Sequence, residues 1–74
     1  MRYTWAITIA RLNGKRELRT VVMAGEPVKG HVVKCQPPGG EAINVRIVHA
    51  GHRPRRRGGT SLGTWTAVIG EEVA

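Results

Sequence analysis

The chain has 74 residues, with twelve Lys and Arg against five Glu and no Asp, and a net charge of +7. This length allows one small domain at most, and the single Cys excludes an internal disulfide, so self-association or pairing with another macromolecule is favoured. The positive charge indicates phosphate polymers, anionic surfaces or acidic proteins as partners.

In residues 2–12 large side chains alternate with small Thr and Ala residues, which is typical of a half-buried β-strand. The large set, Tyr3, Trp5, Ile7 and Ile9, forms its apolar face. Asn13-Gly14 follows and predicts a two-residue hairpin turn into a second strand over 15–23. This turn would pair Ile9 with Leu18. The second strand would then direct three side chains to the apolar face of the first: Leu18, Thr20 and Val22.

Residues 28–35 predict a third strand and residues 42–50 a fourth, with a turn by composition at the PPGG stretch between them. The fourth strand has Ile43, Val45 and Ile47 on one face. If PPGG is a four-residue loop, Val32 opposes Val45 and both face the core. The same register directs a basic set outward, namely Lys29, His31 and, opposite His31, Arg46.

Residues 61–70 predict a fifth strand, and residues 71–74 an acidic tail outside the domain. The likelier inward stripe of this strand is Trp65, Ala67 and Ile69. Because turn signals separate five strands and no helical period occurs, we expect one all-β domain over residues 1–70. Five short antiparallel strands would form a small SH3-like or OB-like barrel or a strongly curled sheet, either of which limits exposed edges.

The segment GHRPRRRGGTS, residues 51–61, has no apolar side chain and the densest positive charge of the chain. Guanidinium groups present planar sets of donors that suit phosphate oxygens. The aromatic side chains fall on apolar stripes, which disfavours base stacking and favours contact with the phosphates of duplex DNA or structured RNA, with little sequence specificity. The predicted nucleic-acid-binding residues are Arg53, Arg55, Arg56, Arg57 and His52, extended by Lys29 and Arg46.

Metal and catalytic sites are not predicted. The possible zinc ligands His31, Cys35, His49 and His52 lie on opposite faces in the predicted register and cannot converge. Cys35 is expected to pack as a small hydrophobe. With no Asp and few Glu, no acid–base pair or oriented nucleophile is evident, so we expect neither an enzyme nor a cofactor.

An alternative function remains open. The basic loop could dock on an acidic protein, in which case the chain would be a protein-interaction module or a small assembly or accessory subunit. A homodimer is possible in either case, whereas no amphipathic helix or lipidation signal indicates a membrane partner. The free Cys and the absence of an export signal predict a cytoplasmic location.

Overall fold

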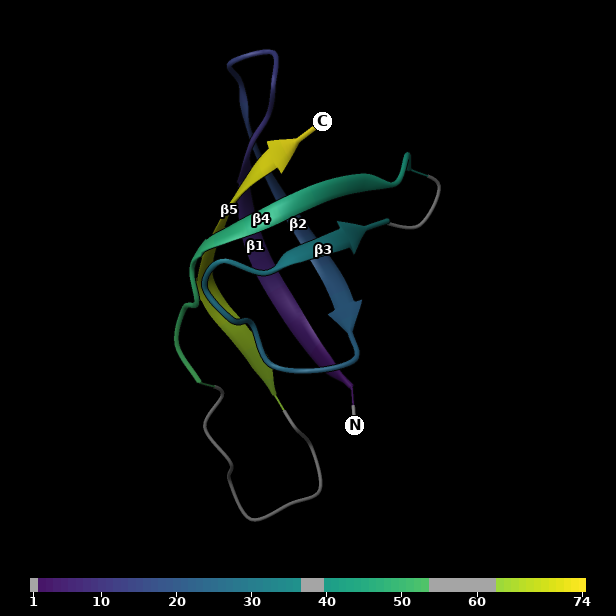
Figure 1. Cartoon of the computed structure of the whole chain (residues 1–74). Helices are drawn as coiled ribbons and strands as arrows, with labels where there is room; N and C mark the ends of the chain where they lie inside the picture. The colour runs from purple at the N-terminus through teal and green to yellow at the C-terminus, as the bar shows by residue number, and fades with distance from the viewer. Residues whose placement is uncertain (1, 37–39, 54–62) are drawn as a thin grey trace.

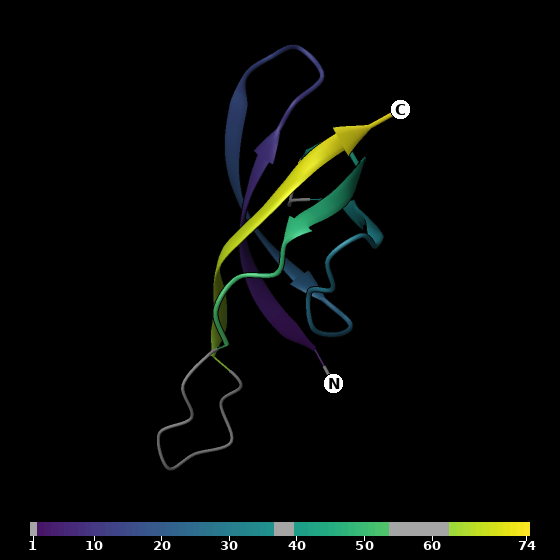
Figure 2. The same cartoon turned by 60° about the vertical axis from the view of Figure 1, so that its left-hand side comes forward.

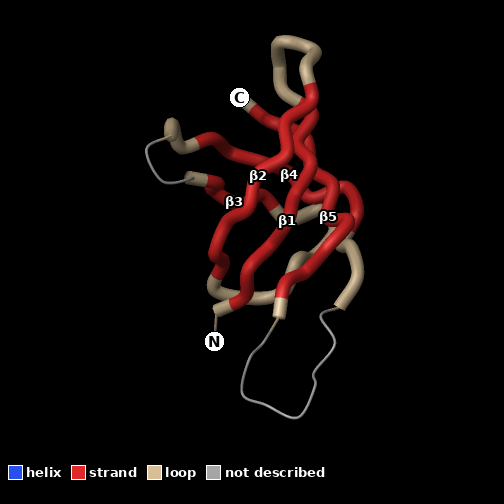
Figure 3. The backbone as a smooth tube through the Cα atoms, turned by 180° about the vertical axis from the view of Figure 1, so that it is seen from behind, coloured by secondary structure: helices blue, strands red, loops and turns tan. Residues whose placement is uncertain are grey.

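The computed structural model describes residues 2–36, 40–53 and 63–74. They form five strands: β1 (Tyr3–Ala10), β2 (Arg16–Met23), β3 (Val32–Cys35), β4 (Ile43–His49) and β5 (Thr64–Val73). The described residues contain no helix, which confirms the all-β prediction (Figure 1 and Figure 3).

The strands form one sheet in the order β2-β1-β5-β4-β3. Three neighbouring pairs are antiparallel, but β1 and β5 at the centre run parallel. The prediction of antiparallel strands throughout is therefore wrong, because local turn signals specify each hairpin but not how two hairpins join. The sheet curls into a half-barrel in which β3 and β4 lie across from β1 and β2 (Figure 2).

The β1–β2 hairpin closes with a three-residue loop, 12–14, instead of the predicted two-residue turn. The Arg11 N–H donates to the Lys15 carbonyl at 2.8 Å, and the Gly14 N–H donates to the Arg11 carbonyl at 3.0 Å. Gly14 has a φ of 85°, a left-handed conformation that glycine adopts without steric cost. A turn followed by a glycine bulge is the common form of such a loop, and it shifts the pairing by one residue.

The shift turns β2 over relative to the prediction, because side chains alternate between faces. Ile9 opposes Glu17 rather than Leu18. Val21 enters the core, whereas Leu18 and Val22 are exposed on the outer face.

The β3–β4 pairing is also one residue away from the predicted register. Cys35 opposes Ile43, so residues 36–42 connect the strands rather than a four-residue loop. Val33 and Cys35 therefore face the core side, and Val32 is exposed. Turn composition marked the connection but did not specify its length.

The fifth strand contains an irregularity at Ala67, whose φ is 56°, and the register to both neighbouring strands shifts nearby. Such a bulge adds a residue and reverses the alternation of faces. Val68 and Gly70 are consequently buried, whereas Ala67 and Ile69 are exposed, contrary to the prediction. The strand also continues through residues 71–73, which pair with β4. Glu71 in addition pairs with Ala10 of β1.

The core lies on the concave side of the half-barrel, where the apolar stripes of β1 and β4 were predicted correctly. It consists of Trp5, Ile7, Ile9, Val21, Cys35, Ile43, Val45, Ile47, Trp65 and Val68. At Gly70 a Cβ atom would meet the side chains of Val45 and Ile7. The absence of a side chain there allows β4, β5 and β1 to pack closely at the centre of the sheet.

Candidate nucleic-acid interface

The described start of the basic segment, residues 51–53, is anchored by an extension of the β4–β5 pairing. His52 forms an antiparallel bridge with Thr66, in which the His52 N–H donates to the Thr66 carbonyl at 2.7 Å. Gly51 has a φ of 82°, and a Cβ atom at this position would collide with the Thr66 carbonyl. Only glycine fits here, so this residue determines how the chain leaves β4 toward the arginines.

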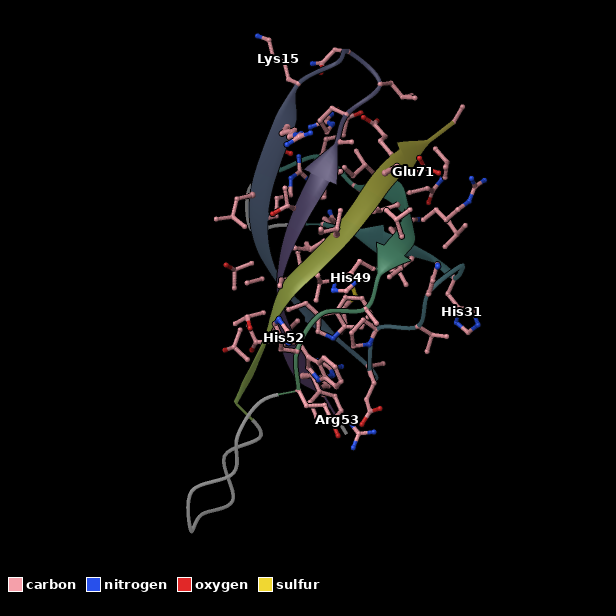
Figure 4. All side chains as sticks on the ribbon, turned by 90° about the vertical axis from the view of Figure 1, so that its left-hand side faces the viewer. Lys15, His31, His49, His52, Arg53 and Glu71 are labelled. Atoms are coloured by element: carbon pink, nitrogen blue, oxygen red, sulfur yellow. The ribbon has the colours of Figure 1, made fainter. Side chains whose placement is uncertain are left out.

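His52 and Arg53 are exposed at the end of the molecule opposite the hairpin tip that carries Lys15 (Figure 4). Lys29 is exposed in the connection that precedes β3. The structure thus places His52 and Arg53 side by side through chain connectivity. The other three predicted loop residues lie outside the described residues: Arg55, Arg56 and Arg57.

Arg46 occupies an exposed position on β4 and opposes Glu71 of β5. Its Nη1 donates to the Glu71 Oε1 at 2.9 Å, and both side chains are about half exposed. The predicted juxtaposition of His31 with Arg46 is wrong, because Val32 opposes Arg46 in the observed register. Arg46 therefore has an acidic neighbour that the sequence did not reveal.

A chain of ion pairs extends across the hairpin end of the sheet. The Arg11 Nε donates to Glu72 at 2.6 Å, and the Arg11 Nη1 donates to Glu17 at 2.9 Å. The Arg19 Nε donates to the same Glu17 oxygen at 2.6 Å, while its Nη1 donates to the Glu41 carbonyl at 3.3 Å. These contacts join the residue after β1 to β2 and β5.

The ion pairs shift the ionisation of the carboxylates. The hydrogen bond from Arg19 holds the pKa of Glu17 below its usual value, and Arg11 adds to this effect. The hydrogen bond from Arg11, with a backbone donor at Leu12, does the same for the pKa of Glu72. Both glutamates are therefore stabilised in the charged form that the arginines require.

These contacts separate the basic residues into those that have a carboxylate partner among the described residues and all the others. Three glutamates, Glu17, Glu71 and Glu72, are paired with three arginines, Arg11, Arg19 and Arg46. Twelve basic residues less those three leave nine against the two remaining glutamates, so the net charge of +7 belongs to this second group. Four of the nine are the arginines of residues 53–57.

Sequence inspection missed the paired group for two reasons. The sequence predicts residues 71–74 as an acidic tail, whereas Glu71 and Glu72 belong to β5 and provide two of the three paired carboxylates. The predicted register directs Leu18 and Thr20 inward and therefore Arg19 outward, whereas the Arg19 side chain lies inward and is only 11% exposed. The sequence does contain a signal for the longer strand. Glu71 and Glu72 directly follow the alternating segment and are followed by Val73, so the strand can continue through them.

The aromatic side chains belong to the core side, as predicted. Trp5 and Trp65 are buried, and Tyr3 packs edge-to-face against Trp65 with ring centroids 6.3 Å apart. The Trp5 Nε1 donates to the Gly25 carbonyl at 3.0 Å, whereas the buried Trp65 Nε1 has no acceptor among the described residues. Since these are all the aromatic residues of the chain, an exposed ring platform for stacked bases is not available.

Cys35 is fully buried in the core, which confirms its prediction as a small packed side chain. Burial raises the pKa of its thiol, and the nearby positive charge of Arg19 opposes this shift. His31, His49 and His52 are exposed. Within residues 2–36, 40–53 and 63–74, no three His, Cys, Asp or Glu residues gather closely enough to hold a metal ion.

Within the described residues, no helix has the length and apolar character needed to cross a membrane. No protein-family model, no curated protein and no solved structure matches the chain.

Proposed function

We propose that this protein binds nucleic acid through the phosphate backbone, with little sequence specificity. The main contacts come from the arginine-rich loop, Arg53, Arg55, Arg56 and Arg57, together with His52. Lys29 and Arg46 extend this surface. The ligand is duplex DNA or structured RNA, whose phosphates are regularly spaced along a helix.

The observation that carries the proposal is the division of charge described above. Arg11 and Arg19 have carboxylate partners, whereas Arg53 is exposed and, like Arg16, has no acidic contact among the described residues. Arginine without a carboxylate partner remains available for bidentate contact with phosphate. Arg46 would have to share its guanidinium between Glu71 and a phosphate, so we expect its contribution to be smaller.

The buried aromatic side chains support charge-based contact over stacking. Proteins that hold single strands place exposed rings under successive bases. Trp5 and Trp65 are instead buried in the core. We therefore expect duplex probes to bind at least as tightly as single strands of equal length.

The salt dependence of binding tests this proposal. If each loop arginine neutralises one phosphate of duplex DNA, log K falls with log salt with a slope of about −3.6. Replacing Arg53, Arg55, Arg56 and Arg57 by Ala should flatten this slope, measured by fluorescence anisotropy with labelled DNA and hairpin RNA. Equal binding by the wild type and the quadruple variant would contradict the proposal.

A matched pair of variants separates local contact from overall charge. Arg55→Ala/Arg56→Ala and Lys15→Ala/Arg16→Ala each remove two adjacent positive charges, from the loop and from the hairpin end respectively. We expect the loop variant to make the salt slope less steep by about 1.8 and the hairpin variant to leave the slope nearly unchanged. Absence of binding to every probe at low salt would instead favour an acidic protein as the partner.

A further inference from the structure

The two edges of the sheet differ in how well they are protected from pairing with another strand. At one edge β3 has four residues, VVKC, and includes the exposed Lys34. Short edge strands that carry lysine resist the addition of further strands. At the other edge β2 has eight residues, RELRTVVM, with no proline or glycine to interrupt it. The second edge is therefore longer and has no lysine, proline or glycine, although it carries three charged residues, Arg16, Glu17 and Arg19.

The outer face of β2 is apolar along its centre. Leu18 and Val22 are 71% and 63% exposed, and Thr20 between them is also exposed. Leu18 opposes Thr8 of β1, which in turn lies beside Ile69 of β5, so the uncharged surface continues across three strands. A shallow depression of about 210 Å³, lined by Thr8, Ala10, Arg16 and Ile69, lies next to this row.

The backbone of β2 has free hydrogen-bonding groups on this edge. Arg11 and Lys15 form a hydrogen-bonded pair at the hairpin loop. Hydrogen-bonded and non-hydrogen-bonded pairs alternate along an antiparallel ladder, so the N–H and C=O groups of Leu18 and Thr20 point away from β1. Within the described part of the chain, β2 has no strand neighbour on that side.

We propose that β2 pairs antiparallel with β2 of a second copy of this chain, about a two-fold axis at Leu18. Two-fold pairing of identical strands makes each residue face a fixed partner, so charge selects the register. An axis at Glu17 or Arg19 would oppose like charges, which destabilises a strand pair. An axis at Leu18 instead opposes Glu17 to Arg19 of the partner subunit, and does so twice.

The Leu18 register is more favourable than its nearest alternative. An axis at Thr20 would place Glu17 opposite the partner's Met23 and would form no new pair between charges. With the axis at Leu18, the Glu17–Arg19 ion pair of one subunit lies beside the same pair of the other subunit. Leu18 then packs on Leu18 of the partner subunit. The dimer extends one sheet across both subunits and joins their apolar outer faces. It does not depend on phosphate binding.

The oligomeric state tests the interface. Light scattering over a concentration series should show a dimer for the wild type and for Thr20→Val. Thr20→Pro should be monomeric but folded by circular dichroism, because the lost N–H points away from β1 and proline is tolerated at such edge positions. Leu18→Lys provides a second variant that protects the edge by charge. A monomeric wild type, or dimers of both edge variants, would overturn the proposal.

Cysteine crosslinking tests the register. Residues directly opposite in a hydrogen-bonded pair have Cα atoms about 5.5 Å apart, within the range of a disulfide. Leu18→Cys should therefore crosslink on mild oxidation, whereas Thr20→Cys should not, since it would face the partner's Arg16. Cys35 is buried and leaves the wild type as an uncrosslinked control. Crosslinking of Thr20→Cys alone would exclude the Leu18 axis. Retained phosphate binding by Thr20→Pro would show that the two proposals are independent.

Discussion

At the hairpin end of the molecule Arg11 lies between Glu17 and Glu72, whereas Arg53 at the loop end is exposed and contacts no carboxylate among the described residues. Neither arginine stands next to an acidic residue in the sequence, but their surroundings in the fold differ. Arg11 joins three strands, and Arg53 remains available to an external anion. The register of the strands, more than the local density of charge, determines which arginines are structural and which are free.

The largest expected effect comes from the glycine that anchors the loop end. Gly51→Ala forces a Cβ atom against the Thr66 carbonyl in a left-handed conformation, so we expect a loss of about 2–4 kcal/mol in the free energy of unfolding. Urea denaturation measures this loss. Gly25→Ala is the matched control, since a Cβ atom at Gly25 meets nothing within 4 Å. Equal stability of the two variants would show that the loop base is not held as described.

Of two single arginine substitutions, one should lower stability without changing binding, and the other should weaken binding without changing stability. Arg11→Ala removes the contacts with both glutamates and should lower the melting temperature while leaving the salt slope of binding unchanged. Arg53→Ala should leave the melting temperature unchanged and lower the salt slope by about 0.9. Thermal melts and anisotropy titrations of the same two proteins measure both quantities. If both variants lose binding equally, the distinction between the two ends is wrong.

Acid should destabilise the protein by protonating the glutamates paired at the hairpin end. The pKa values of Glu17 and Glu72 in the folded chain lie below the ordinary value of 4.5, so the unfolded chain binds more protons between the two values. This contribution to stability is complete above the unfolded pKa and is lost as pH falls through the folded pKa. Melting temperatures measured from about pH 6 to about pH 2 should therefore fall in this window.

Paired glutamine variants identify the source of the acid effect. Glu17→Gln/Glu72→Gln should have a smaller fall in melting temperature over this window than the wild type, because no carboxylates remain to be protonated in the network. Glu26→Gln/Glu41→Gln changes the net charge equally and should retain most of the wild-type fall. The opposite ranking would indicate that general charge repulsion, rather than the ion-pair chain, causes the loss.

The smallest effect is expected for the exposed pair on β4 and β5. Arg46 and Glu71 are both about half exposed, and such surface pairs contribute little because water and salt screen them. Arg46→Ala should change the free energy of unfolding by less than about 0.5 kcal/mol, by urea denaturation. A loss as large as that of Gly51→Ala would place Arg46 among the structural arginines.

Much of the fold was predictable from the sequence, because a period of two in side-chain character identifies strands directly. The apolar stripes of Trp5, Ile7 and Ile9 and of Val45 and Ile47 were assigned correctly. The errors occurred where a single residue changed the phase. A three-residue loop reversed β2, a longer connection reversed β3, and the bulge at Ala67 reversed the end of β5.

The candidate site was predictable only in part for the same reason. His52 and Arg53 are adjacent in the chain, so their proximity requires no tertiary information. The pairing of Arg46 with Glu71 depends on strands from separate segments and on where β5 ends. The Arg11–Glu72 contact likewise joins residues from opposite ends of the chain.

The sequence by itself determined that this chain forms five strands, which side chains of β1 and β4 fill the core, and where the arginines are densest. Only the tertiary structure decided that β1 and β5 run parallel, which face of β2 is exposed, and which arginines meet a glutamate. The physical reason is that hydrophobic alternation repeats every two residues. One residue more or less in a turn or strand inverts the faces without altering the pattern, so packing across the whole sheet selects the register.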